Sequence, residues 1–129
     1  MARVFMILAG LTGAAGVGFS AMAAHALQDQ LTAQAVDWVE TAGTYLLLHA
    51  PALAICAILA HRRPHRMPLA AGTLFVLGLA GFSGGLLLLA LAELRPAIAV
   101  VPVGGTLLLL GWLALAVIGL TWPRNRQDS

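Results

Sequence analysis

The chain has 129 residues, of which 60% are hydrophobic and only 9% are charged. A soluble domain has roughly 25% charged residues, so this composition excludes a soluble enzyme. The net charge is only +2, and the seven cations are all arginines that form no basic stripe. We therefore expect no nucleic-acid partner.

Four apolar segments span residues 4–27, 41–60, 67–92 and 97–122. Each reaches the roughly 20 residues that a helix needs to cross about 30 Å of hydrocarbon. The sequence predicts an all-α integral membrane protein, a four-transmembrane-helix bundle forming one domain over residues 1–129, with the lipid bilayer as its partner. Arg3 and the small residues after Ser20 resemble a signal peptide, but the apolar run continues to Leu27, which favours an uncleaved first helix.

The segment between the first two spans, residues 28–40, is amphipathic. Leu31, Ala35 and Trp38 recur at helical spacing, whereas Asp29 and Asp37 fall on another face. This pattern predicts a separate short helix that lies at the membrane interface, with Trp38 at headgroup level.

The arginines are distributed unevenly about the predicted spans. Six of them flank the side that holds both ends of the chain and the loop between the second and third spans, and only Arg95 lies on the other side. The positive-inside rule therefore predicts that both termini are cytoplasmic.

Small residues at four-residue spacing predict where helices pack closely, because they let two backbones approach. Homo-oligomer formation, or membership of a larger membrane complex, is compatible with such faces. The candidate packing residues are Gly10, Ala14 and Gly18 in the first span, Gly81 and Gly85 in the third, and Gly111 in the fourth.

Few polar side chains lie within the spans, where they are costly and usually face the interior of a bundle. At about 1.5 Å per residue, His49 lies ~12 Å from the outer end of its span, and Ser83 and Thr106 lie ~14 Å from theirs. We therefore predict that these three side chains converge. The full candidate polar cluster is His49, Ser83, Thr106, Tyr45, Ser20 and His25.

Prolines and paired glycines predict weak points in two helices. Pro51 has no backbone N–H to donate, which predicts a kink beside His49. A comparable interruption is expected at Pro102, Gly104 and Gly105. Interrupted helices at membrane depth can expose backbone groups to a bound solute. The alternative is that the prolines only bend the helices and that His49 forms a structural hydrogen bond between helices, to Ser83 or Thr106.

Pairs of histidines offer other sites. His25 and Asp29 share a helix face but lack a second pair of ligands, and His61 and His65 are typical of a solvated turn, so no metal site is predicted. His25 and His49 lie on consecutive helices and are an alternative pair of haem ligands. The sequence has no nucleotide-binding loop, Ser/His/Asp set or intramembrane carboxylate pair, so we expect neither a cofactor nor an enzyme.

Four ordered segments resemble those of one family of small membrane proteins. Residues 18–27 (GFSAMAAHAL) resemble its GAFGAHAL segment, residues 45–50 (YLLLHA) its YQxYHAL segment, residues 81–86 (GFSGGL) its LFSGSLY segment, and residues 101–105 (VPVGG), with a later Gly-Trp pair, its TPIGG…GW segment. Along nearly its whole length the chain is similar to the domain of unknown function 423 family, which includes YgdD-like and transmembrane protein 256-like proteins.

The resemblance implies four transmembrane helices and a bacterial inner-membrane location, and it implies no established activity. Leu46 and Leu48 replace polar residues of the family pattern, whereas His25 and His49 are retained. The favoured function is therefore structural or accessory, as an oligomer or a subunit of a larger assembly. Two alternatives stay open. The first is binding or transport of a small solute, an ion or a lipid at the polar cluster around His49. The second is haem binding by His25 and His49.

Overall fold

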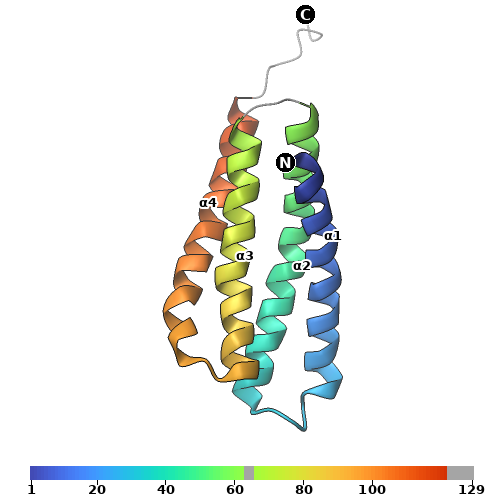
Figure 1. Ribbon diagram of the computed structural model, residues 1–129, viewed down its shortest axis with the longest axis vertical. Coiled ribbons are helices and arrows are strands. Elements are labelled where there is room, and N and C mark those ends of the chain that lie inside the picture. Colours follow the sequence, from blue (N-terminus) through green and yellow to red (C-terminus); the bar gives the residue numbers. More distant parts are fainter. Residues whose placement is uncertain (63–65, 122–129) are drawn as a thin grey trace, which may run out of the picture.

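A computed structural model describes residues 1–62 and 66–121 of the chain. This part contains α1 (Ala2–Ala21), η1 (Met22–Ala26), α2 (Ala33–Arg62), α3 (Arg66–Ala92), η2 (Arg95–Ala99) and α4 (Val100–Leu120), and no strand (Figure 1). Here η1 is a π-helical turn and η2 is a short 3₁₀-helix.

Four helical stretches are long and apolar enough to cross a membrane. They are Ala2–Ala26, Ala33–Arg62, Arg66–Ala92 and Arg95–Leu120, with 25, 30, 27 and 26 residues. A helix satisfies all of its interior backbone N–H and C=O groups within its own segment, which hydrocarbon requires because it offers no hydrogen bonds. The predicted class, an all-α protein with four membrane spans, is confirmed.

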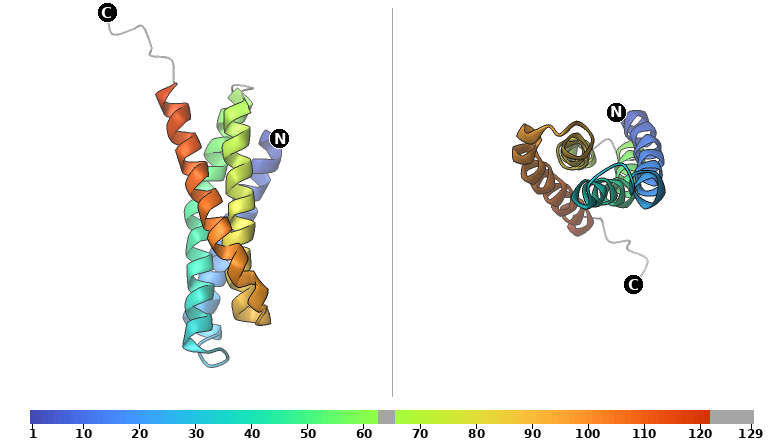
Figure 2. Two further views of the ribbon diagram at one scale, coloured as in Figure 1. Left: turned by 90° about the vertical axis from the view of Figure 1, so that its left-hand side faces the viewer. Right: turned by 90° about the horizontal axis from the view of Figure 1, so that it is seen from below.

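The helices run up and down in alternation, so that the start of α1 and the end of α4 lie at the same end (Figure 1). Each helix packs on its neighbours in the chain, and no Cα atoms of α1 and α4 approach within 8 Å. Seen from below, α1 and α4 lie on opposite sides with α2 and α3 between them (Figure 2). The bundle is therefore open rather than closed, and α1 and α4 each leave one broad face uncovered.

Residues 33–40 of the segment predicted as a separate interfacial helix are instead the beginning of α2, and residues 28–32 form the turn before it, so that prediction is wrong. Thr32 caps this helix, because its Oγ1 accepts a hydrogen bond of 3.2 Å from the backbone N–H of Ala35. Ala35, Val39 and Ala42 are all buried and lie on one face of α2. The apolar spacing therefore reflects packing against the bundle rather than a helix lying on the membrane.

The structure assigns no break in either helix at the prolines and glycines predicted as interruptions. Pro51 lies inside the continuous helix α2, exposed on its surface. Pro102 falls in the first turn of α4, where a missing N–H removes no intrahelical bond. Gly104 and Gly105 continue the same helix.

The helical path changes at η1 instead. There the backbone N–H of Leu27 donates to the carbonyl of Met22, five residues earlier, at 3.0 Å. The side-chain amides of Gln28 and Gln30 donate to the carbonyls of Ala23 and Ala26, at 3.3 and 3.0 Å. These two glutamines satisfy carbonyls that the end of a helix leaves without an intrahelical partner.

Glycines mark the close contact between α3 and α4. A Cβ atom built on Gly81 would lie 3.1 Å from Cα of Gly104, which places the backbones of α3 and α4 in contact. A Cβ on Gly85 would lie 2.8 Å from the Val101 side chain, and one on Gly111 would lie 2.7 Å from the Phe75 ring. The structure thus places Gly81, Gly85 and Gly111 between α3 and α4.

The other predicted packing stripe, Gly10, Ala14 and Gly18, faces away from the other helices of this chain. A Cβ on Gly10 or Gly18 would have no neighbour within 4 Å, and Ala14 between them is exposed. The residue that packs closely is Gly16, where a Cβ would lie 2.8 Å from the backbone nitrogen of Leu47 in α2. Because α1 is apolar on every side, its sequence has no polar stripe that would mark the exposed face.

Candidate functional site

The imidazole of His49 lies in the middle of α2 and is only 5% exposed. Its Nε2 atom accepts a hydrogen bond of 3.1 Å from the indole Nε1–H of Trp112 in α4. Its Nδ1 atom lies 2.7 Å from the carbonyl oxygen of Tyr45, one turn earlier in α2. Because an indole nitrogen can only donate, Nε2 is unprotonated and Nδ1 carries the proton that it donates to Tyr45.

Aromatic rings surround this imidazole. Tyr45 stacks on His49 with a centroid distance of 5.7 Å and an interplanar angle of 17°. The rings of Phe75 and Trp112 lie at 5.6 and 5.8 Å, both tilted by 57°. Phe82 packs on Tyr45, with ring centroids 4.3 Å apart. These five side chains come from α2, α3 and α4.

This layer of rings joins two helices that are not backbone neighbours. No Cα atoms of α2 and α4 approach within 8 Å, so only long side chains can span the distance. Phe75 fills the space between them and meets Trp112 edge to face, with centroids 5.3 Å apart. Gly111 makes room for the Phe75 ring, because any Cβ at that position would overlap it.

The predicted convergence of His49 with Ser83 and Thr106 does not form. Ser83 is fully buried, and its hydroxyl donates to the carbonyl of Ala42 at 3.2 Å. Ala42 precedes His49 by two turns, which is ~10 Å along the helix axis. Thr106 is exposed, and its hydroxyl donates to the carbonyl of Pro102 in its own helix at 2.9 Å.

The error has a physical cause. The predicted depths assume a second span beginning near residue 41, whereas α2 begins at Ala33. This earlier start places His49 about eight residues deeper relative to the end of its helix, a shift of ~12 Å. His49 does hydrogen-bond to another helix, but its partner is Trp112 and not Ser83 or Thr106, the partners expected in the structural interpretation.

The remaining members of the cluster are dispersed. Of these, only Tyr45 lies beside His49. Ser20 lies on α1, where its Oγ atom would be 2.6 Å from a Cβ on Gly43. His25 is exposed in η1, at the end of the bundle far from His49, so the structure does not bring the two candidate haem ligands together.

The histidines and acids that the structure describes form no group that could hold a metal ion. No group of three or more His, Cys, Asp or Glu side chains within residues 1–62 and 66–121 is placed to hold a metal ion. His61 is exposed at the end of α2, and His65 lies outside the described residues.

Sequence reasoning missed Trp112 and Phe75 as partners of His49. The signal for Trp112 was available, because an indole N–H within hydrocarbon needs an acceptor and His49 is a strong candidate at membrane depth. Phe75 gave no signal, since a phenylalanine in an apolar span has no polar atom that restricts its position.

Comparisons with known proteins place this architecture among membrane proteins of unknown function. Residues 19–105 match the family model described as "Protein of unknown function (DUF423)". The chain is 35% identical over 118 residues to a "UPF0382 membrane protein" of Staphylococcus epidermidis, covering 92% of this chain and 96% of the relative.

Two further relatives show the same extent of similarity. A "UPF0382 membrane protein" of Haemophilus influenzae is 33% identical, covering 90% of this chain and 93% of its own length. The "UPF0382 inner membrane protein YgdD" of Escherichia coli is 34% identical, covering 91% of this chain and 88% of its own length. No solved structure matches the chain.

Proposed function

Because this chain belongs to the DUF423 family of membrane proteins, whose biochemical role is unknown, we propose from its structure that it acts as a structural, accessory membrane protein and not as an enzyme. In this proposal the His49–Trp112 pair holds α2 and α4 at a fixed spacing. The uncovered faces of α1 and α4 are then available to other components of a membrane assembly.

The observation that carries this proposal is the use of both His49 nitrogens within the chain. One donates to Tyr45 and the other accepts from Trp112, so neither is available to a substrate or a ligand. Across residues 1–62 and 66–121, no buried side-chain nitrogen or oxygen lacks a hydrogen-bond partner. When every interior polar group already has a hydrogen-bond partner within the chain, a structural role is favoured over catalysis or ligand binding.

Native mass spectrometry of the protein from gently solubilised membranes tests this function. We expect a complex heavier than one 13.4 kDa chain, with no small molecule other than lipid bound in stoichiometric amount. In His49→Phe the composition of the complex is expected to stay unchanged. A non-lipid molecule that is present in the wild type and absent from His49→Phe would overturn the proposal, as would a single chain without partners.

The same pair gives an energetic measurement. Hydrogen bonds within membranes average about 0.6 kcal/mol in double-mutant cycles and reach about 1.7 kcal/mol. We expect a coupling in this range between His49→Phe and Trp112→Phe, measured by unfolding in detergent. Leu48→Phe is the matched control, because Leu48 is 59% exposed beside His49, and it is expected to show no coupling to Trp112→Phe.

We also propose that the chain lies in the bacterial inner membrane with both ends cytoplasmic. The relative YgdD bears the description of an inner membrane protein. At the end of the bundle where α1 starts lie Arg3, Arg62 and Arg66, whereas Arg95 lies at the other end. The positive-inside rule assigns the arginine-rich end to the cytoplasm.

Thiol labelling on intact cells measures this orientation. Arg62→Cys and Gln34→Cys place exposed thiols at opposite ends of α2, in a background where Cys56→Ala removes the only native thiol. An impermeant reagent is expected to label residue 34 and to spare residue 62 until the cells are opened. Labelling of residue 62 alone would reverse the orientation.

A further inference from the structure

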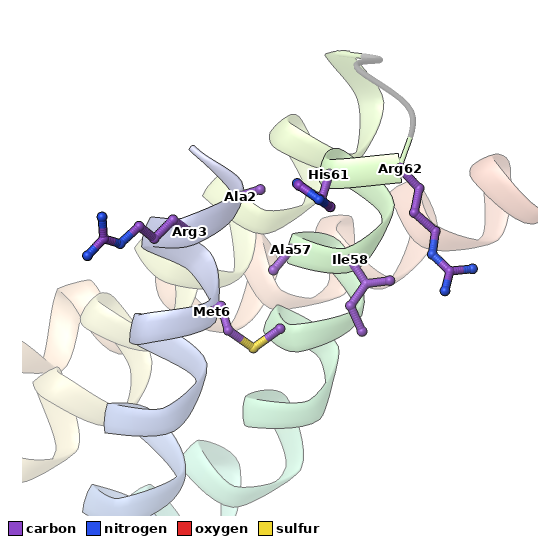
Figure 3. Close-up of a pocket in the computed structure, with 7 residues that line it drawn as sticks. All are labelled: Ala2, Arg3, Met6, Ala57, Ile58, His61 and Arg62. Atoms are coloured by element: carbon purple, nitrogen blue, oxygen red, sulfur yellow. The ribbon is translucent and has the colours of Figure 1, made fainter.

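A cavity of about 250 Å³ lies between the first turns of α1 and the last turns of α2. Arg3 and Met6 line it from α1, and Ile58, His61 and Arg62 line it from α2 (Figure 3). It lies where both membrane spans end, since one span begins at Ala2 and the other ends at Arg62. The cavity therefore faces the boundary between headgroups and hydrocarbon.

Two arginines border the mouth of this cavity. Figure 3 shows their side chains pointing outward in opposite directions, with the His61 ring between them. All four carboxylates of the described residues, which are Asp29, Asp37, Glu40 and Glu93, belong to segments at the opposite end of the bundle. The two guanidinium groups thus have no acidic side chain of the described chain near them.

The two helix ends at this cavity carry partial charges of opposite sign. Arg3 lies in the first turn of α1, which has no acidic residue and no side-chain cap. The N-terminal end of a helix carries a partial positive charge, so it disfavours a cation and favours an anion. The C-terminal end of α2 at the same cavity carries a comparable partial negative charge, so attraction of an anion rests on the two arginines and not on the helix ends.

The lower part of the cavity is apolar. Met6 and Ile58 are 45% and 44% exposed, while Ala57 beneath them is buried. A ligand that fits both parts has an anionic head and an apolar chain.

We propose that this cavity binds an anionic phospholipid of the surrounding leaflet. The phosphate lies at the mouth of the cavity. The Arg3 and Arg62 side chains, which point outward in Figure 3, reach its oxygens by rotating about their flexible stems and then form charge-assisted hydrogen bonds. One acyl chain lies along Met6 and Ile58. Basic pockets between transmembrane helices are known to hold anionic headgroups in this manner. The site is separate from the His49–Trp112 pair and goes beyond the structural role proposed above.

Lipid retention tests the site. The wild type and an Arg3→Gln/Arg62→Gln variant are reconstituted in nanodiscs of phosphatidylcholine with a minor fraction of phosphatidylglycerol, and the bound lipids are counted by native mass spectrometry. We expect the wild type to retain phosphatidylglycerol selectively and the double variant to lose this selectivity about tenfold. Arg66→Gln is a control at the same end but outside the cavity, and Arg95→Gln is a control at the far end.

The outcomes distinguish a specific lipid site from nonspecific attraction and from a site for free phosphate. An equal loss in Arg66→Gln would show that only general surface charge attracts the lipid, and equal retention of both lipids by the wild type would remove the site. Displacement by millimolar inorganic phosphate would show that a free phosphate suffices as the ligand, which contradicts the role of the acyl chain. Unchanged melting of the double variant in pure phosphatidylcholine checks the fold. None of these readouts involves His49, so the outcome is independent of the structural function proposed above.

Discussion

Replacing Gly104 with alanine is expected to force α3 and α4 apart and to lower the free energy of unfolding by about 3 kcal/mol, the upper part of the range for overpacked sites. A Cβ at this position would overlap the backbone nitrogen of Phe82 and would lie 2.6 Å from the carbonyl carbon of Gly81 and 2.8 Å from the carbonyl oxygen of Gly78. All three atoms belong to the backbone of α3. No side-chain rotation can relieve such contacts, so the helices themselves must move.

The neighbouring residue Gly105 provides the matched control. A Cβ there would meet only the ring of Phe82, at 3.4 Å, which is an ordinary contact. Gly105→Ala changes the same helix by the same single methyl group, and alanine favours helix by about 1 kcal/mol over glycine in an exposed site. We therefore expect Gly105→Ala to be neutral or stabilising. Unfolding titrations of both variants in detergent measure the difference.

Separation of α3 and α4 has a second consequence that can be measured. Trp112 reaches His49 from α4, so an outward shift of this helix lengthens the 3.1 Å hydrogen bond between them. The fluorescence of Trp112 is expected to change in Gly104→Ala and to stay unchanged in Gly105→Ala. The packing argument would be contradicted if Gly104→Ala melted like the wild type with the same emission.

The membrane spans and one helix interface could be predicted from the sequence, for clear physical reasons. Hydrocarbon requires long apolar helices, and the length of each apolar run defines a span directly. Gly81 and Gly85 could be identified because α3 packs on both sides, on α2 and on α4, so that small residues on most of its faces meet another helix.

Other features depend on how each helix is rotated about its axis and shifted along it relative to its neighbours. An apolar sequence gives no visible signal for either. α1 packs on α2 through Gly16, whereas the more regular Gly10–Gly18 stripe faces outward. The partner of His49 depended on where α2 begins, and the Thr32 cap that sets this point has no strong sequence signature among the polar residues of the loop. Placing the start of this helix eight residues too late was enough to predict the wrong hydrogen-bond partners for His49.

The close contact between α1 and α2 predicts that a larger residue at Gly43 destabilises the protein. Gly43 of α2 faces Ser20 of α1, and a Cβ on Gly43 would lie 2.6 Å from Oγ of Ser20 and 2.9 Å from its backbone nitrogen. The carbonyl oxygen of Gly16 would lie 3.1 Å away. We expect Gly43→Ala to destabilise the protein by about 2 kcal/mol, because this overlap involves both a side chain and a backbone.

The mixed nature of this contact allows a rescue that the α3–α4 interface does not allow. Ser20→Ala removes the hydroxyl oxygen that comes nearest to the new methyl group, so the double variant Gly43→Ala/Ser20→Ala is expected to recover part of the loss. Recovery is incomplete, because the backbone nitrogen of Ser20 stays within 2.9 Å. Gly18→Ala on the outer face of α1 has no neighbour within 4 Å and is expected to leave stability unchanged. If Gly18→Ala destabilised the protein as much as Gly43→Ala, with no rescue by Ser20→Ala, α1 would have to pack through its other face, against a partner outside this chain.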